Sequence, residues 1–481
     1  MADSVDQLAR KAAALLNAEP ADDGAAAYRA LLDADPDRPD DWYNLGFCLR
    51  RAHRFEEALE AYGQALDRGA SGPEEIRLNR AVIYSDGLRQ PDAAAKELEA
   101  ALAIRPDYVP AWLNLGNLHE DRGAREEAEA AYRKALEVEP HNPLALLRLA
   151  EVTRFDTADH PLLTRLSGYL RAPNLPPMAR ADLGFALGRG YDQAGAYDRA
   201  FAAYEDGNRG TRQLAGAPYD PSAQEHLVDR IIAAFDVPAS INGGPEPVFV
   251  CGMFRSGSTL AERILGAHSG LTAGGELEFI PAMVQRELQP YPEKAANLGT
   301  SDVTRLRERY LDGLDRIGLP GDRWIDKRPD NFLHIGLIKL LFPRARIVNT
   351  VRNPLDNCLS VFFAHLDARM TYAQSLDGAA HWYRQYQRLM THWRSLYPDA
   401  IHDFDYDAMV ADPRPNIEAL LGFLGLEWEA ACLEPHIGSG AVRTASAWQV
   451  REPLYTRSSG RWRNYQAHIA PLLKEFGSPA D

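Results

Sequence analysis

Apolar and polar positions in roughly the first two hundred residues follow helical spacing, and the pattern repeats along the chain. Six positions recur with a shift of 70 residues, which is two periods of 35: Trp42, Leu45, Gly46, Ala58, Tyr62 and Ala65 return as Trp112, Leu115, Gly116, Ala128, Tyr132 and Ala135. Small residues at fixed places let paired helices approach closely, and the aromatic residues fill the space between neighbouring pairs. The pattern therefore predicts a stack of helical hairpins in which the recurring aromatics are core residues and not ligand contacts.

A copy without tryptophan lies between these two, and residues 87–91 lengthen its internal turn. Pro106 and Pro140 mark repeat ends 34 residues apart, weaker copies lie at 28–36 and 149–150, and a degenerate pair returns at 187–207. A period near 34 residues with this composition resembles the tetratricopeptide repeat. We predict an all-α tetratricopeptide solenoid over residues 1–214.

Such a stack commonly curves into a groove that receives an extended peptide, so a protein partner in the groove is one interpretation. The other interpretation is a scaffold or a dimerisation arm, and the sequence leaves a homodimer open. In neither case does this half carry the chemistry.

The helical repeat pattern ends at residue 214. Turn-forming residues punctuate 215–246 around one short helix, which predicts a linker. Strand-like runs at 247–251, 346–351 and 400–404 then alternate with helical segments, as in a parallel sheet with helices on both faces. The expected fold class is multidomain: the solenoid, followed by a P-loop-like α/β domain at 247–475 with a central parallel sheet.

The first of these strands runs into a turn that is rich in glycine and hydroxyl groups. Its residues are Arg255, Ser256, Gly257, Ser258, Thr259 and Leu260. Backbone N–H groups, hydroxyls and the positive end of a following helix bind anions, so the turn predicts a phosphate or sulfate cradle. Leu260 follows where a Walker A loop requires lysine, which points away from ATP hydrolysis. An ordinary strand-to-helix turn with an exposed arginine is the alternative.

Further polar residues follow at spacings that suit the same chemistry. Glu276 lies 21 residues after Arg255, Lys327 follows, and Arg352 ends another apolar run ahead of a helical segment with Ser360. The ends of parallel strands favour anion binding by Arg352 and Ser360. The alternatives are a surface pair for Arg352 and Ser360, and a salt bridge of Lys327 with Asp326 or Asp330.

Together these motifs, over residues 245–470, resemble the PAPS-dependent sulfotransferases, and most closely their tyrosylprotein branch. The resemblance implies that the cradle binds the 5′-phosphosulfate and that Arg352 and Ser360 bind the 3′-phosphate. It implies catalytic roles for Arg255, Lys327, Ser446 and Glu276, with Glu276 as the base and Glu278 as its rival. It also implies that the cofactor shell is completed by Tyr406, Ser446 and Arg461.

Four departures from the family pattern affect these expectations. Ala273 and Ile325 stand where the relatives have cysteines, so the disulfide of those positions is impossible, and Gly275 replaces the first of two glutamates. Ala364 stands where an arginine is expected beside the 3′-phosphate; Arg369 or another residue would have to replace it.

Neither a metal nor a disulfide framework can be read from the sequence. His268 is expected to end the helix after the cradle, and His365 and His381 lack metal-ligand spacing. The four cysteines are scattered singly. We expect PAPS as the co-substrate and no metal.

Charge separates the two halves. Residues 1–240 carry 27 Lys or Arg against 40 Asp or Glu, whereas 241–481 carry 26 against 28, within a net charge of −15. An acidic solenoid argues against nucleic acid or an anionic membrane as a partner. It also fits poorly with acidic tyrosine sites, so a basic or neutral acceptor stays open. No apolar run is long enough to span a membrane and no leader segment is recognisable, so we expect a cytoplasmic protein.

The expected function is sulfuryl transfer from PAPS to a hydroxyl of a peptide, a protein or a small molecule, with a protein tyrosine as the leading acceptor. The alternatives are a sulfotransferase acting on a small molecule or glycan, a non-catalytic adaptor that binds PAP, and an unusual nucleotide kinase or nucleotidase.

Overall fold

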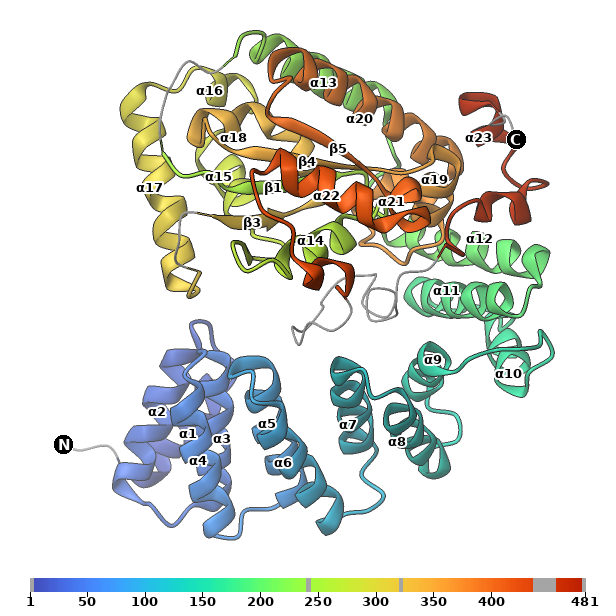
Figure 1. The fold of residues 1–481 in the computed structure, drawn as a ribbon. Helices are drawn as coiled ribbons and strands as arrows, with labels where there is room; N and C mark the ends of the chain where they lie inside the picture. The colour runs from blue at the N-terminus through green and yellow to red at the C-terminus, as the bar shows by residue number, and fades with distance from the viewer. Residues whose placement is uncertain (1–3, 239–243, 320–322, 436–455, 478–481) are drawn as a thin grey trace. The chain divides into compact units, whose positions relative to one another are not determined.

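The computed structural model describes residues 4–238, 244–319, 323–435 and 456–477. It divides into two compact units, Met1–Arg154 and Phe155–Asp481 (Figure 1). Each unit is described separately below.

The first unit consists of helices that pack as antiparallel neighbours along the chain (Figure 1). Their bounds are α1 (Val5–Leu15), α2 (Ala21–Ala34), α3 (Pro39–Arg51), α4 (Phe55–Asp67), α5 (Pro73–Val82), α6 (Pro91–Ile104), α7 (Val109–Arg122), α8 (Arg125–Val138) and α9 (Pro143–Val152). The sequence predicts a lengthened turn at 87–91, but the structure lengthens the helix instead: a π-helical turn at Ile83–Gly87 extends α5, and the link at 88–90 is as short as the link at 52–54 between α3 and α4.

The recurring glycine and tyrosine positions meet inside each hairpin. A Cβ on Gly46 would lie 2.7 Å from the Tyr62 ring, and one on Gly116 would lie 2.3 Å from the Tyr132 ring. Both tyrosines are fully buried. The recurring tryptophans stabilise the turns that precede their helices. The indole N–H of Trp42 donates to the Pro36 carbonyl, and the indole N–H of Trp112 donates to the Pro106 carbonyl, each at 2.9 Å. The recurring aromatic residues are therefore structural, as predicted.

The second unit begins with four helices: α10 (Pro161–Leu170), α11 (Pro177–Gln193), α12 (Tyr197–Leu214) and α13 (Pro221–Ala234). The pair α11 and α12 keeps the repeat contact, since a Cβ on Gly188 would lie 2.6 Å from the Tyr204 ring. The same pair packs on the α/β part: Tyr204 stacks on Phe363 with ring centroids 4.0 Å apart, and Asn208 Nδ2 donates to the Phe362 carbonyl at 2.8 Å. The compact unit thus begins at residue 155. The domain limits 1–214, 215–246 and 247–475 follow the repeat pattern and stay a prediction.

Five parallel strands form the sheet of the second unit, in the order β2-β3-β1-β4-β5 (Figure 1). The strands are β1 (Val248–Gly252), β2 (Thr272–Ala273), β3 (Trp324–Lys327), β4 (Arg346–Val351) and β5 (Ile401–Asp405). This confirms a helical-repeat region followed by an α/β domain with a central parallel sheet. The sequence pattern located β1, β4 and β5 and missed β2 and β3, which are short.

Helices cover both faces of the sheet. The helices that follow β1 are α14 (Ser258–Gly266), α15 (Phe279–Glu287), α16 (Glu293–Ala296), α17 (Thr300–Arg316), α18 (Ile335–Leu341), α19 (Pro354–Phe362), α20 (Leu376–Leu396), α21 (Tyr406–Ala411), α22 (Pro413–Phe423) and α23 (Ala470–Phe476). Short 3-10 turns lie at Pro329–Leu333, Thr371–Gln374, Ala430–Leu433 and Arg461–Tyr465.

Alternate residues of β1 face opposite sides of the sheet. Val248 and Val250 join the core cluster that α14 and α22 contribute to, whereas the Phe249 ring packs against Tyr310 of α17. Because all the strands are parallel, their carboxyl ends lie at one edge, where ligands of open α/β sheets bind. The predicted chemistry-bearing residues follow these strand ends.

Candidate active site

The turn between β1 and α14 has a backbone that only a few residue types tolerate. Gly252 and Gly257 have φ values of 141° and 103°, in the region that favours glycine. A Cβ on Gly252 would lie 2.4 Å from the Thr350 carbonyl oxygen, and one on Gly257 would lie 2.7 Å from the Tyr406 ring. Arg255 has a φ of 68°, which is costly for a residue with a side chain. The turn is thus held between β4 and α21 in a strained shape.

The hydroxyls of the turn divide into two groups. Ser256 is buried, and its Oγ donates to the Met253 carbonyl at 2.6 Å and lies 2.6 Å from Thr350 Oγ1, so it ties the turn to β4. Ser258 and Thr259 begin α14, whose N-terminal end has no side-chain cap. The first N–H groups of an uncapped helix are donors for an anion, which fits the predicted cradle. Leu260 packs against the core, so its predicted contact would come from its backbone.

The structure brings the cradle together with the end of β4. Arg255 Nε donates to Ser360 Oγ at 3.3 Å, and Arg352 Nη1 donates to the Arg255 carbonyl at 3.1 Å. Arg352 and Ser360 are each 8% exposed, so they are not a surface pair. Among the described residues, Arg352 Nε is buried and has no hydrogen-bond partner. A buried guanidinium N–H of this kind fits an anionic ligand.

The segment 456–462 packs against Arg352 and the start of α19. Arg352 Nη2 donates to the Ser458 carbonyl at 2.5 Å, and the Asp356 carboxylate accepts from the N–H groups of Gly460 and Trp462 at 2.6 and 2.8 Å. Asp407 accepts from Ser459 Oγ at 2.5 Å. Sequence reasoning missed both carboxylates. The signal for Asp356 was its place one helical turn after Arg352 at the start of α19.

Tyr406 and Arg461, which are both predicted to complete the cofactor shell, lie in different surroundings. The Arg352 guanidinium lies 5.0 Å from the Tyr406 ring centroid, so Tyr406 joins the cradle. Arg461 instead forms an ion pair with Asp192 of α11 at 2.7 Å and lies over the Phe363 ring. Its predicted cofactor contact stays a prediction. Ser446 lies outside the described residues.

The side chains of Glu276 and Lys327 form an ion pair. Lys327 Nζ lies 2.5 Å from Glu276 Oε1; the lysine is 1% exposed and the glutamate side chain is 41% exposed. The alternative partners of Lys327 are engaged elsewhere: Asp326 accepts from the Tyr310 hydroxyl at 2.6 Å, and Asp330 pairs with Arg328 at 3.0 Å. An exposed carboxylate beside a buried ammonium suits a base that faces an incoming hydroxyl.

Glu278, the alternative candidate for the base, and His268 each form contacts with other residues. Glu278 pairs with Arg328 at 2.5 Å, and its side chain is 74% exposed. His268 follows the end of α14, as predicted, and its Nε2 lies 2.9 Å from the Glu427 carbonyl.

The structure places the remaining singled-out residues away from this chemistry. His365 stacks on Phe185, and His381 lies 2.7 Å from the Tyr219 hydroxyl. Arg369 is 91% exposed and pairs with Asp367. The four cysteines are buried and free. Within the described ranges, no group of three or more histidines, cysteines or carboxylates is arranged to hold a metal, and no helix is both long and apolar enough to cross a membrane.

Asp326 makes the stability of the second unit pH-dependent. Burial raises the pKa of Asp326 to about 7, although hydrogen bonds from Tyr310 and Asn331 oppose this rise. The ordinary value is 3.8, so between about pH 4 and pH 7 the folded protein holds a proton that the unfolded chain lacks. Stability therefore falls as pH rises through this window, by at most about 4 kcal/mol.

We expect Asp326→Asn to flatten this part of the pH dependence and to be more stable than the wild type at pH 8. Asparagine stays neutral and still accepts from Tyr310. Denaturant unfolding at pH 4.5, 6 and 8 measures the effect. Equal pH slopes for the two proteins would contradict the assignment.

Helical hairpins followed by a parallel sheet, with the predicted anion-binding residues at its strand ends, define a two-part protein: a repeat region and an α/β domain. Residues 247–430 match the model of the sulfotransferase family, and residues 39–68 and 109–142 match tetratricopeptide repeat models. The chain therefore combines tetratricopeptide repeats with a domain of the sulfotransferase family.

Two protein sequences and one solved structure are similar to parts of this chain. An uncharacterized protein of Aquifex aeolicus (strain VF5) is 29% identical over 415 residues, which are 82% of this chain and 52% of that protein. The chain thus spans about half the length of that relative. Protein-tyrosine sulfotransferase 1 of Danio rerio is 25% identical over 48% of this chain and 71% of its own. The sulfotransferase domain of the Synechococcus PCC 7002 olefin synthase aligns with 51% of this chain and 99% of its own, at 22% identity and a TM-score of 0.38.

Proposed function

We propose that the protein transfers a sulfuryl group from PAPS to a hydroxyl acceptor. The observation that carries this proposal is the Lys327–Glu276 pair at 2.5 Å, at the same sheet edge as the strained anion turn. The sulfotransferase family model covers both.

PAPS fits the residues that are present. The uncapped start of α14 offers N–H groups for the 5′-phosphosulfate, and the close packing around Gly252 and Gly257 leaves the turn no room for side chains there. Arg352 donates to the carbonyl of Arg255, whose side chain donates to Ser360, and the unpartnered Nε of Arg352 suits the 3′-phosphate.

The roles of the residues follow from charge and position. When PAPS is bound, it supplies an activated sulfuryl group. Glu276 takes the proton of the acceptor hydroxyl, whose oxygen forms a bond to sulfur as the bond from sulfur to the phosphate oxygen breaks. Arg255 and Lys327 stabilise the charge that develops on the transferring group, and fixed cations that do not need to reorganise do this best.

A tyrosine of a protein or peptide is the acceptor that we propose first. A phenol needs less help from a base than an alkyl alcohol, and several relatives are protein-tyrosine sulfotransferases. A small molecule or glycan acceptor, and a non-catalytic role in PAP binding, are the alternatives.

Incubation of the full chain with labelled PAPS and panels of peptides, glycans and phenols tests the function. We expect label on one panel and release of PAP. Binding of PAP without turnover would favour the adaptor. If no acceptor leads to release of PAP and PAP causes no thermal shift, the sulfotransferase assignment is wrong.

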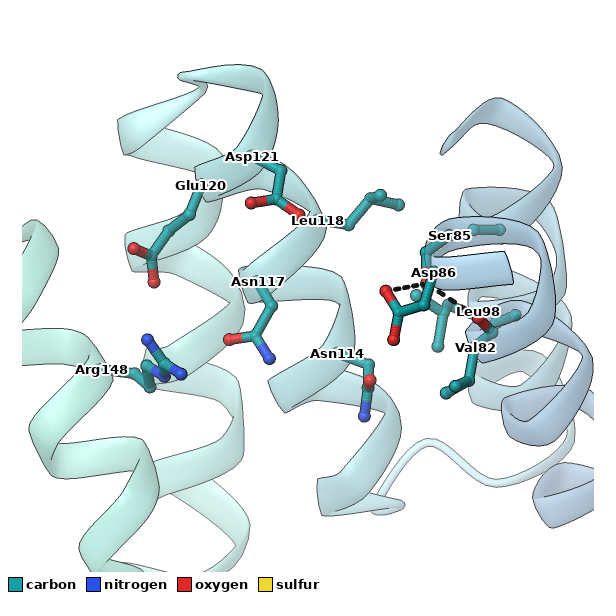
Figure 2. A pocket seen from close by; sticks show the side chains of 12 residues that line it. Val82, Ser85, Asp86, Leu98, Asn114, Asn117, Leu118, Glu120, Asp121 and Arg148 are labelled. Carbon is teal, nitrogen blue, oxygen red and sulfur yellow. Dashed lines mark hydrogen bonds between the residues drawn. The ribbon is translucent and has the colours of Figure 1, made fainter. Parts of the chain in front are cut away.

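The repeat unit contains a cavity that supports a second role, the binding of a polypeptide partner. The cavity has a volume of about 280 Å³, and its wall is mainly α7, with Asp86 opposite and Leu98 at its side (Figure 2). Asn114, Asn117, Glu120 and Asp121 of α7 line that wall.

Negative charge and amide groups dominate this cavity. Its one cation, Arg148, pairs with Glu151 at 2.9 Å. The Tyr132 hydroxyl contacts both Asn117 Oδ1 and Glu120 Oε1, at 2.8 and 2.5 Å, and donates its one hydrogen between them. We propose that the cavity receives a basic side chain of a partner, because charge complementarity favours this choice.

We expect basic peptides to bind the full chain and acidic peptides not to bind. Asp86→Lys should weaken binding of the basic peptides about tenfold by introducing like-charge repulsion. Asp92→Lys is the matched control, since Asp92 is exposed on α6 and lies outside the cavity. Fluorescence anisotropy measures both. Equal affinities for the three proteins would contradict the proposal.

A further inference from the structure

Glu262 is a buried carboxylate that the roles proposed above do not use. It lies on α14, the helix that begins at the cradle, and is 8% exposed. Burying a carboxylate is costly unless it is paired and hydrogen-bonded. Its contacts lead to the two residues at the centre of the proposed reaction.

The first contact fixes the segment that carries Glu276. Glu262 Oε1 accepts from the Gly275 N–H at 2.8 Å, and the Lys327 N–H donates to the Gly275 carbonyl at 3.0 Å. Gly275 has a φ of 74°, in the left-handed region. Both backbone groups of the residue before Glu276 are therefore held, one by Glu262 and one by β3.

The second contact is electrostatic. Glu262 Oε2 lies 3.9 Å from Lys327 Nζ, and Glu276 Oε1 lies 2.5 Å from the same atom, so two carboxylates share one buried ammonium group. The other charged group that acts on Glu262 is Arg263, on its own helix. Burial raises the pKa of Glu262 and Glu276 adds to this rise, while Lys327, the Gly275 N–H and Arg263 oppose it.

The two carboxylates that share Lys327 affect the charge balance when Glu276 takes the acceptor proton. Before the transfer the three side chains sum to one negative charge, and once Glu276 holds the proton they sum to zero, because Glu262 still balances Lys327. Without Glu262, proton transfer would leave a buried ammonium group with no carboxylate partner, which is costly.

We propose that Glu262 is a positioning residue: it fixes the Glu276 segment through Gly275 and remains the counter-ion of Lys327 when Glu276 accepts the proton. This inference rests on the proposed sulfuryl transfer. Throughout, the new bond joins the acceptor oxygen to sulfur, and the electron pair of the broken bond leaves with PAP.

The variants Glu262→Gln and Glu262→Ala separate the two parts. Glutamine can still accept from the Gly275 N–H and lacks the charge, whereas alanine removes both. The matched control is Glu429→Gln, because Glu429 also accepts a backbone N–H, that of Ser269 at 2.9 Å, and has no lysine partner among the described residues.

For Glu262→Gln we expect kcat to fall about tenfold or more, the size of a weakened general-base step. The KM for the acceptor and the affinity for PAP should stay the same, because Glu262 contacts neither. Glu262→Ala should lose more, and Glu429→Gln should match the wild type.

The outcomes are distinguishable. If the wild type is active and Glu262→Gln has the same kcat, this inference alone is overturned. A lower kcat together with a raised acceptor KM or a weaker affinity for PAP assigns Glu262 a merely structural role and also overturns it. A wild type that transfers no sulfuryl group overturns the proposed function, and the inference falls with it.

Discussion

Glu276→Gln should bind PAP as the wild type does and lose sulfuryl transfer by about 10² to 10⁴-fold, the contribution of a well-placed general base. Glutamine keeps the shape of the side chain and an oxygen that accepts from Lys327 Nζ, which now lies 2.5 Å from Glu276 Oε1. It has no oxygen that can take a proton from the acceptor. The loss should therefore appear in kcat, with the fold and the cradle unchanged.

Glu278→Gln is the matched comparison for this prediction. Glu278 has the same side chain two residues further on, but it pairs with Arg328 and is largely exposed. We expect near-normal transfer by this variant. Single-turnover assays with labelled PAPS, and calorimetry with PAP, separate chemistry from binding. Full activity of Glu276→Gln together with an inactive Glu278→Gln would move the base to Glu278.

Local signals explain why the repeats and the cradle could be predicted. The contact of Gly116 with Tyr132 and the bond from Trp112 to Pro106 join residues that are close in sequence, so a fixed period reveals them. The turn after β1 likewise combines glycine, hydroxyls and an arginine within a few residues. Its anion-binding character therefore appears in the sequence alone.

Contacts between distant segments explain what was missed. β3 is a four-residue strand that contains Asp326 and Lys327, so no apolar pattern marks it, and its place beside β1 depends on the whole sheet. The role of Glu262 depends on its contacts with Gly275 and Lys327, which lie far from it in the sequence and become visible only in the folded structure. Arg461 pairs with Asp192, 269 positions earlier, and no spacing rule connects the two. Tertiary packing, not motif chemistry, decides these contacts.

Replacing Arg352 by alanine should lower the affinity for PAP about 100-fold. Arg352 is 8% exposed and has one unpartnered N–H among the described residues, and its other two nitrogens donate to the carbonyls of Arg255 and Ser458. A charge-assisted hydrogen bond to a buried group contributes about 1.5 to 3 kcal/mol, and a 100-fold loss corresponds to about 2.7 kcal/mol, so the bond from this one N–H to the phosphate accounts for it. Calorimetry with PAP measures it.

Two comparison variants sharpen the test of Arg352. Arg352→Lys keeps the charge but cannot donate in three fixed directions, so we expect an intermediate affinity. Arg414→Ala removes a cation from an exposed ion pair with Glu418 on α22 and should leave PAP binding unchanged. Because Arg352 holds both the cradle turn and the segment at Ser458, its loss should also reduce the protection of the Ser459 and Gly460 amides from hydrogen exchange. Unchanged PAP affinity in Arg352→Ala would show that the 3′-phosphate is bound elsewhere, and the loss of amide protection would then reflect a structural role of Arg352.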